Sequence, residues 1–296
     1  MKIKKLRENI LGFVKKNFLT LYKVIIIIGG YIKFFNKINR KKKYTKFSSN
    51  LDKINDFEYQ ITSQNNEDGI INYIFDKLKI NKLNFIEIGF DYYQNNSLGI
   101  LNKCNKGLFI DGDNKKVIIL RAVLKLFYPK TEITVQNALV NIDNINKIKQ
   151  QNFNDQEEID FLSIDVDGID YYLLKEINFK PKLICIEYNF WFGKDLSCAV
   201  PYKKNYALDS LSNYVGASLK ALTELANSKG YHLIAIDSAC INAFFIRDDL
   251  KHNFEILNLE KSFKYPFKFK KEFVAEIKEK LLLKDLKYFN QIKWLR

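Results

Sequence analysis

The chain of 296 residues is poor in the residues that several common kinds of site require. It has only two His, and Cys104, Cys185, Cys198 and Cys240 form neither a CxxC pair nor a Cys/His cluster at zinc-ligand spacing. These isolated cysteines indicate reduced thiols and a cytoplasmic protein. Four Pro and twelve Gly exclude collagen-like and low-complexity chains, and 47% apolar residues exclude a disordered one.

Acidic residues are scarce at the two ends of the chain, and this produces the formal net charge of +14. Residues 1–50 hold 14 Lys and Arg and a single acid, and residues 251–296 hold 12 basic and 6 acidic residues. Residues 51–250 hold 22 basic and 27 acidic residues. Because this body is mildly acidic, it is not expected to contain a nucleic-acid groove, and no nucleic-acid partner is predicted.

The first fifty residues lack an uninterrupted apolar run long enough to span a bilayer. Residues 18–35 are rich in apolar side chains, but Lys23 and Lys33 interrupt them, and no small-residue cleavage site follows. Residues 1–50 are therefore predicted to form a helical arm with a basic segment at 40–43. The arm either binds an anionic membrane surface, which would make the protein peripheral on the inner face of the membrane, or packs on the body.

The body, residues 51–250, is predicted to be an α/β domain with a mostly parallel sheet covered by helices on both faces. Its apolar runs predict strands at 84–89, 107–111, 132–135, 160–165, 182–187, 231–236 and 243–246. The clearest predicted helices are 68–78, 115–126, 171–177 and 218–229. Residues 251–296 are predicted to be a C-terminal helical appendage, because apolar residues recur at helical spacing at Phe273, Ile277, Leu281 and Leu282.

Carboxylates and amides follow nearly every predicted strand, at the point where the strand ends. They are Glu87, Asp111, Asp113, Asn137, Asp165, Asp167, Glu187 and Asn189. Ligands of open α/β sheets bind beyond the carboxyl ends of the strands. Since an unpaired buried carboxylate is costly, several on one edge imply a ligand with hydroxyls, amines or a cation.

The first two acids have a specific use in binding a nucleoside. Glu87-x-Gly89 lets the backbone approach a ligand closely, and Asp111 at the end of the second strand is placed to accept ribose hydroxyls. The Gly-rich turn that a pyrophosphate requires is missing, because residues 90–94 contain no glycine. A nucleoside without a pyrophosphate, such as S-adenosylmethionine (SAM), therefore fits better than NAD. Taken singly, either acid fits a strand-end cap better, but the ordered set of acids favours a nucleoside.

The combination of these motifs resembles the FkbM-type SAM-dependent methyltransferases, a branch of the class I methyltransferases. The matching stretches within residues 60–250 are 63–70, 85–89, 95–96, 107–113, 161–171, 186–189 and 214–219. The resemblance implies a Rossmann-like, seven-stranded, mostly parallel sheet whose last strand is antiparallel. It also implies methyl transfer from SAM to a hydroxyl of a glycan or small-molecule acceptor, as in polysaccharide biosynthesis. In one departure from the family, Phe90-Asp91-Tyr92-Tyr93 replaces the usual Gly-rich turn.

This resemblance and the strand-end placement assign roles to individual residues. SAM is expected to contact Glu87, Gly89, Asp111, Asp113, Asn137, Ala138 and Asp165. The candidates for the general base that methyl transfer to a hydroxyl needs are Asp167, Glu187 and His232. The acceptor is expected to contact Gln64, Asp68, Tyr188, Asn189 and Trp191. Asp68 fits a helix cap equally well, and the aromatic residues after 187 fit a loop-packing cluster.

Three other interpretations remain open at the level of the sequence. Asp165, Asp167, Glu187 and Asn189 have the oxygen ligands of a divalent-cation site, although no ligand spacing is diagnostic. The two Asp-x-Asp pairs at 111–113 and 165–167 fit a metal-dependent glycosyltransferase. A non-catalytic nucleoside-binding module at the membrane surface would keep the same fold.

Overall fold

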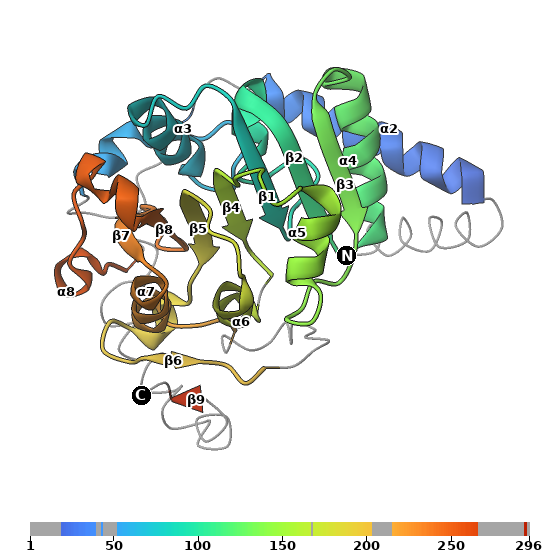
Figure 1. Ribbon diagram of the computed structural model, residues 1–296. Helices are drawn as coiled ribbons and strands as arrows, with labels where there is room; N and C mark the ends of the chain where they lie inside the picture. Colours follow the sequence, from blue (N-terminus) through green and yellow to red (C-terminus); the bar gives the residue numbers. More distant parts are fainter. Residues whose placement is uncertain are drawn as a thin grey trace, which may run out of the picture.

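The computed structural model describes residues 19–39, 43, 52–166, 168–202 and 215–265, together with the backbone of residues 293–294. Within these residues, a seven-stranded sheet forms the centre of the molecule (Figure 1). In the order β3-β2-β1-β4-β5-β8-β7, its strands are β3 (Glu132–Asn137), β2 (Cys104–Asp111), β1 (Leu83–Ile88), β4 (Phe161–Ile164), β5 (Leu183–Glu187), β8 (Asn242–Arg247) and β7 (Tyr231–Ile236).

The strand directions follow the pattern that the sequence predicted. Neighbouring strands from β3 to β5 pair in parallel, whereas β8 is antiparallel to both β5 and β7. Residues 237–241 form the short turn between β7 and β8, and only an antiparallel pair allows so short a connection. The predicted Rossmann-like fold class is confirmed, and every predicted strand is present.

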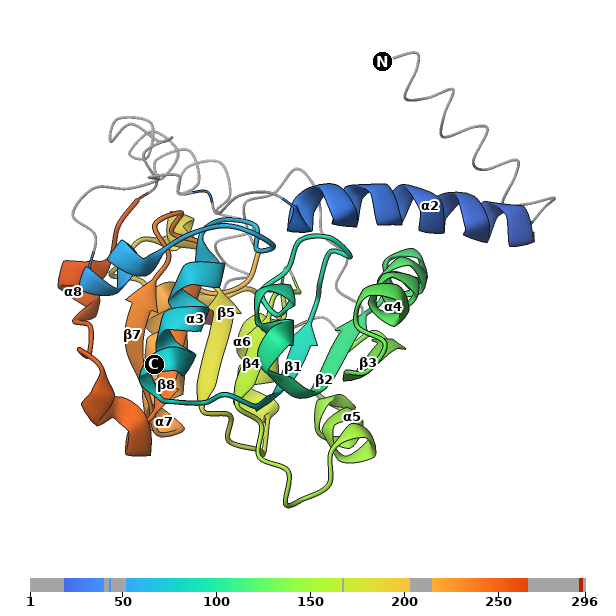
Figure 2. The ribbon, with the colours of Figure 1, turned by 90° about the horizontal axis from the view of Figure 1, so that it is seen from above.

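Helices cover both faces of the sheet (Figure 2). One apolar core lies between the sheet and α3 (Glu67–Lys77) and α4 (Asn114–Phe127). The other lies under α5 (Ile145–Asn152), α6 (Asp170–Glu176) and α7 (Leu219–Ser228). The four predicted helices are confirmed, with each boundary shifted by one residue. The sequence did not predict α5, because its polar composition hides the apolar pair Ile145 and Ile148 that it buries.

The helix α2 (Leu19–Ile38) packs along α4 with one of its faces (Figure 2). Its buried residues include Ile26 and Phe34, and a Cβ on Gly30 would lie 2.1 Å from Ile119 Cγ2, so only glycine allows this approach. The helix continues through Lys23 and Lys33, and residues Leu19–Lys37, with a mean hydropathy of 1.4, are long and apolar enough to cross a membrane by length and composition.

Short elements complete the described chain. The 3-10 helices are η1 (Lys53–Phe57), η2 (Leu98–Lys103), η3 (Phe190–Phe192) and η4 (Asp248–Asn253). The strand β6 (Cys198–Ala199) pairs with β9 (Lys293–Trp294), and α8 (Leu259–Ser262) is a single helical turn. The helix predicted around residues 273–282 lies outside the described residues.

Candidate functional site

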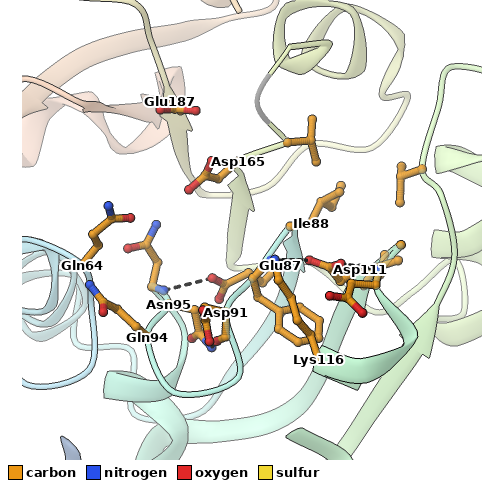
Figure 3. Close-up of a pocket in the computed structure, with 18 of the residues that line it drawn as sticks. Gln64, Glu87, Ile88, Asp91, Gln94, Asn95, Asp111, Lys116, Asp165 and Glu187 are labelled. Carbon is orange, nitrogen blue, oxygen red and sulfur yellow. Dashed lines mark hydrogen bonds and ion pairs between the residues drawn. The ribbon is translucent and has the colours of Figure 1, made fainter. Parts of the chain in front are cut away.

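A cavity of about 750 Å³ opens at the carboxyl ends of β1, β2, β4 and β5, beside the start of β8 (Figure 3). It is the place where the sequence predicted a ligand. Eight of the predicted site residues line it, namely Gln64, Glu87, Gly89, Asp111, Asp113, Ala138, Asp165 and Glu187. The cavity therefore brings together side chains from at least four strands on one rim, which is the arrangement of a binding site.

Glu87 is the most deeply buried carboxylate that ends a strand of this cavity, with only 2% of its surface exposed. Its Oε1 accepts a hydrogen bond from the Asn96 N–H at 2.9 Å, and its Oε2 accepts one from the Ser97 N–H at 2.8 Å. Burial nevertheless raises the pKa of the Glu87 carboxyl to about 7. Glu87 therefore fixes the loop before η2, and its carboxyl group gains or loses its proton near neutral pH.

Gly89 allows the ends of β1 and β4 to meet. Its φ is +78°, and a Cβ at this position would lie 1.8 Å from the Asp165 carbonyl oxygen. The two segments are joined by the Asp165 N–H, which donates to the Ile88 carbonyl oxygen at 2.9 Å. The sequence predicted that Gly89 serves close approach to a ligand, and the structure adds close approach to the neighbouring strand end.

Asp111 joins three segments around the cavity with one carboxylate. Its Oδ2 accepts hydrogen bonds from the Phe90 N–H at 3.1 Å and from Lys116 Nζ at 3.3 Å, and its Oδ1 accepts one from the Asp113 N–H at 2.6 Å. A carboxylate can accept about four hydrogen bonds, so Oδ1 retains capacity for one more. Only 11% of the side chain is exposed. A ligand hydroxyl that reaches Asp111 meets an oriented acceptor.

Asp113 and Asn137 support this corner of the cavity. Asp113 caps α4 by accepting the Lys115 N–H at 2.8 Å. Asn137 does not line the cavity; its Nδ2 donates to the carbonyl oxygens of Asp111 and Gly112 at 2.9 and 3.0 Å. Ala138 lines the cavity and donates its N–H to the Asp111 carbonyl oxygen at 3.1 Å.

Four residues predicted to contact the acceptor do not line the cavity. Asp68 accepts hydrogen bonds from the N–H groups of Ile61, Thr62 and Ser63 at 2.6–2.9 Å, which makes it the anchor of a turn. Tyr188, one residue beyond Glu187, points into the core because successive strand residues face opposite sides. Asn189 caps η3 by accepting the Trp191 N–H at 2.9 Å, and Trp191 lies on that short helix.

The structure places His232 at the wrong end of the sheet for a base. His232 and Leu183 both lie level with Ile246, so His232 is about 13 Å from the level of Glu187 at the far end of β5. Its Nε2 lies 2.6 Å from Asp248 Oδ1 at the protein surface. The assignment of His232 as general base is therefore corrected. Asp167 lies outside the described residues.

The sequence missed Asn242, which lines the cavity at the start of β8. Its Nδ2 donates to Glu67 Oε1 at 2.9 Å, and its Oδ1 is buried without a hydrogen-bond partner. Burial raises the pKa of Glu67, which lines the cavity beside it. The signal in the sequence that could have identified Asn242 is its position as a polar residue at the start of the last strand.

Two further residues were missed on the other side of the cavity. Asp91 and Lys116 line it, and burial raises the pKa of the Asp91 carboxyl. Among the described ranges, which leave out Asp167, no three or more His, Cys, Asp or Glu side chains are grouped so that they could hold a metal ion.

No known protein-family model matches the chain, and no curated protein matches it in sequence. Solved structures similar to it include the N-terminal domain of EvdMO1 with SAH bound, at 11% identity and a TM-score of 0.42, covering 62% of this chain and 80% of that one. A putative O-methyltransferase from Klebsiella pneumoniae is 10% identical with a TM-score of 0.40, covering 75% of this chain and 90% of that one. The O-methyltransferase from Bacillus cereus in complex with SAH is 14% identical with a TM-score of 0.38, covering 60% and 79%. Similarity at this level identifies no family.

Proposed function

We propose that this chain is a SAM-dependent methyltransferase that transfers the methyl group to a hydroxyl of a glycan or small-molecule acceptor. The observation that carries the proposal is Asp111, which ends β2 on the cavity wall with an oriented carboxylate and spare hydrogen-bonding capacity. An acid at the end of the second strand is the ribose-binding position of nucleoside-binding α/β sheets. Gly89, which also lines the cavity, lets the end of β1 lie close to the Asp165 backbone.

The N-terminus of α4 favours a nucleoside without a phosphate. Helix N-termini attract phosphate groups through their free N–H donors. Here the Asp113 carboxylate already accepts the Lys115 N–H, so a negative charge occupies that position.

The order of the strands divides the cavity between cofactor and acceptor. Asp111, Glu87, Asp165 and Glu187 end β2, β1, β4 and β5, which are neighbours in that order. With strands about 4.8 Å apart, Asp111 and Glu187 are separated by about 14 Å of sheet edge. We assign the β1–β2 side, with Glu87 and Asp111, to SAM, and the β5–β8 side, with Glu187 and Asn242, to the acceptor.

The chain's own residues have two tasks in this reaction. SAM supplies, when bound, a methyl group already activated on a sulfonium, so the protein mainly aligns the acceptor oxygen and removes its proton. Glu187 is the described candidate that lines the acceptor side, and in the proposal it takes the hydroxyl proton as the new O–CH₃ bond forms. Asn242 lines the same side, and in the proposal it helps to position the acceptor there.

Calorimetric titration tests the proposal with SAM in one experiment and a uridine diphosphate sugar with Mn²⁺ in another. We expect binding of SAM that weakens by tenfold or more in Asp111→Asn. The matched control is Asp160→Asn. Asp160 also accepts a backbone N–H, from Asn84 at 2.7 Å, and pairs with Lys182 at 2.5 Å, but it directly precedes β4 and does not line the cavity.

Two outcomes would overturn the proposal. A response to the sugar nucleotide that depends on Mn²⁺, with none to SAM, supports the glycosyltransferase. Binding of SAM without methyl transfer to any component of a cell-envelope extract, followed with a radioactive methyl group, supports a binding module without turnover.

A further inference from the structure

We infer that α2 is a membrane-docking element that lies in the plane of an anionic bilayer with its outward face submerged. The first observation is where exposed apolar side chains gather. Seven of the eleven large apolar side chains that are exposed among the described residues belong to α2. Isolated exposed apolar residues are ordinary in soluble proteins, but a contiguous set marks an interaction surface.

Six of these seven side chains, all but Leu19, form one stripe along the helix, which we call the outward stripe. It consists of six residues that are 39–58% exposed, namely Leu21, Val24, Ile25, Ile28, Ile32 and Phe35. Since each helical residue turns by about 100°, the six fall within an arc of about 100°. The buried residues Ile26, Gly30, Phe34 and Lys37 fall on the opposite side, which faces α4 and the body.

The charged residues of α2 lie on its body side, whereas a surface helix of a soluble protein carries its charges on the outer side. The three basic residues of α2, Lys23, Lys33 and Lys37, all lie on the body side by the same rotation, and the outward stripe carries no charge. By contrast, α7 buries Leu219 and Leu222 and exposes Glu224, as a surface helix of a soluble protein does. The outer side of α2 therefore lacks the charge that the outer side of α7 carries, and it fits an apolar medium.

The contacts between α2 and the body favour an in-plane helix over a spanning one. Gly30 packs against Ile119, Tyr31 Oη donates to the Ala122 carbonyl oxygen at 2.9 Å, and Lys37 Nζ, buried, donates to the Ser63 carbonyl oxygen at 3.1 Å. A helix that crossed the bilayer would lose all three contacts. An in-plane helix keeps them and still submerges the outward stripe.

The charge of the neighbouring sequence specifies an anionic surface. Residues 1–50 contain 14 Lys and Arg and one acid, and Arg40, Lys41, Lys42 and Lys43 follow α2 directly. An apolar stripe that is submerged in the bilayer and a basic segment beside it are the two signals that together hold a peripheral protein on an anionic membrane. A second copy that covered the outward stripe with its own α2 would bring a second basic segment close to the first, which like-charge repulsion disfavours.

Vesicle sedimentation of the full chain tests the inference, with phosphatidylcholine vesicles that contain or lack phosphatidylglycerol. We expect binding to the anionic vesicles and at least a tenfold loss in Ile25→Ser/Ile28→Ser/Ile32→Ser. The matched control, Ile25→Leu/Ile28→Leu/Ile32→Leu, keeps the apolar stripe and should bind like the wild type. Equal binding of the serine variant, or no binding by the wild type, would overturn the inference. Self-association that the serine variant abolishes, without vesicle binding, would do the same in favour of a second copy.

An engineered disulfide between α2 and α4 distinguishes an α2 that lies on the membrane from an α2 that crosses it. A Cβ at Gly30 would lie 3.3 Å from Ile119 Cβ, close to the separation of about 3.8 Å in disulfides. Oxidised Gly30→Cys/Ile119→Cys should bind vesicles like its reduced form; loss of binding on oxidation would contradict the in-plane arrangement. Titration of every variant with SAM keeps the two proposals apart, because vesicle binding by a chain that does not bind SAM refutes only the methyltransferase.

Discussion

The two sides of the cavity differ in how completely they are built before a ligand arrives. On the β1–β2 side, Glu87 accepts two backbone N–H groups and Asp111 accepts two more and a lysine. On the β5–β8 side, Asn242 keeps a buried oxygen without a partner. The carboxylates of the first side are therefore held in place by the protein's own hydrogen bonds, whereas a buried amide oxygen of the second side has no such partner.

This difference matches the chemistry that we propose for the two sides. A cofactor is the same molecule in every turnover, so rigid preorganised groups bind it without paying an ordering cost at each encounter. Substitutions on the β1–β2 side should therefore disturb both the fold and cofactor binding. Substitutions on the β5–β8 side should disturb the acceptor alone. Four predictions test this division, beginning with the largest effect.

Gly89→Ala should break the β1–β2 side completely. The new Cβ would lie 1.8 Å from the Asp165 carbonyl oxygen on a backbone with φ of +78°, so we expect a loss of several kcal/mol in stability and no measurable SAM binding. The control is Gly230→Ala, whose φ is +83° but whose Cβ would meet nothing within 4 Å. It should cost only about 1 kcal/mol. Denaturation and titration with SAM check both; equal losses would show that backbone strain, not the clash, sets the effect.

Removing the Glu87 charge should change how stability depends on pH. With a pKa of about 7 when folded, Glu87 holds a proton that the unfolded chain releases near pH 4.3, so its contribution is fully present below that pH and is lost as the pH rises through 7. Denaturation from pH 5 to 8 should therefore show wild-type stability falling more steeply than that of Glu87→Gln, by about 3 kcal/mol between pH 5 and 7. Parallel curves would mean that the carboxylate stays ionised in the fold.

Asp111→Asn should weaken SAM binding by ten- to a hundredfold, which corresponds to about 1.4–3 kcal/mol for a lost charge-assisted hydrogen bond. The amide also repels one of the N–H groups that the Asp111 carboxylate now accepts, so a smaller loss of stability accompanies it. Titration calorimetry gives the affinity and thermal denaturation the stability. An unchanged affinity would show that another acid binds the ribose.

Asn242→Ala should give the smallest effect and sharpen the division. It removes the unsatisfied oxygen together with the hydrogen bond to Glu67. We expect SAM affinity within twofold of the wild type and a several-fold decrease in methyl label transferred to a cell-envelope extract, equivalent to about 1 kcal/mol. A decrease in SAM affinity instead would place Asn242 on the cofactor side.

The fold and one edge of the site could be predicted because they depend on local pattern. Strands buried on both faces are continuous apolar runs, and acids at their ends must meet where parallel strands end. Glu87, Asp111, Asp165 and Glu187 were placed correctly by this reasoning alone.

The rest of the site depends on side-chain direction and on contacts between distant residues. Glu67 lines the cavity and Asp68 does not, because one helical residue separates a cavity-facing direction from a turn-facing one. Glu187 and Tyr188 differ in the same way along a strand. Asn242 meets Glu67 across 175 residues of sequence, which no local spacing reveals. The sequence likewise predicted an apolar arm but not which side of it packs on α4.

The contacts of α2 with the loops beside the cavity have a thermodynamic consequence. Lys37 holds the Ser63 carbonyl oxygen next to Gln64, and the Lys33 ammonium lies 4.9 Å from the centre of the Tyr93 ring, next to Gln94. Both glutamines line the cavity. If docking of α2 changes the affinity of these loops for a ligand by some factor, then the ligand must change the affinity for the bilayer by the same factor, because equilibrium coupling is reciprocal. Measuring vesicle binding with and without SAM reads this coupling directly.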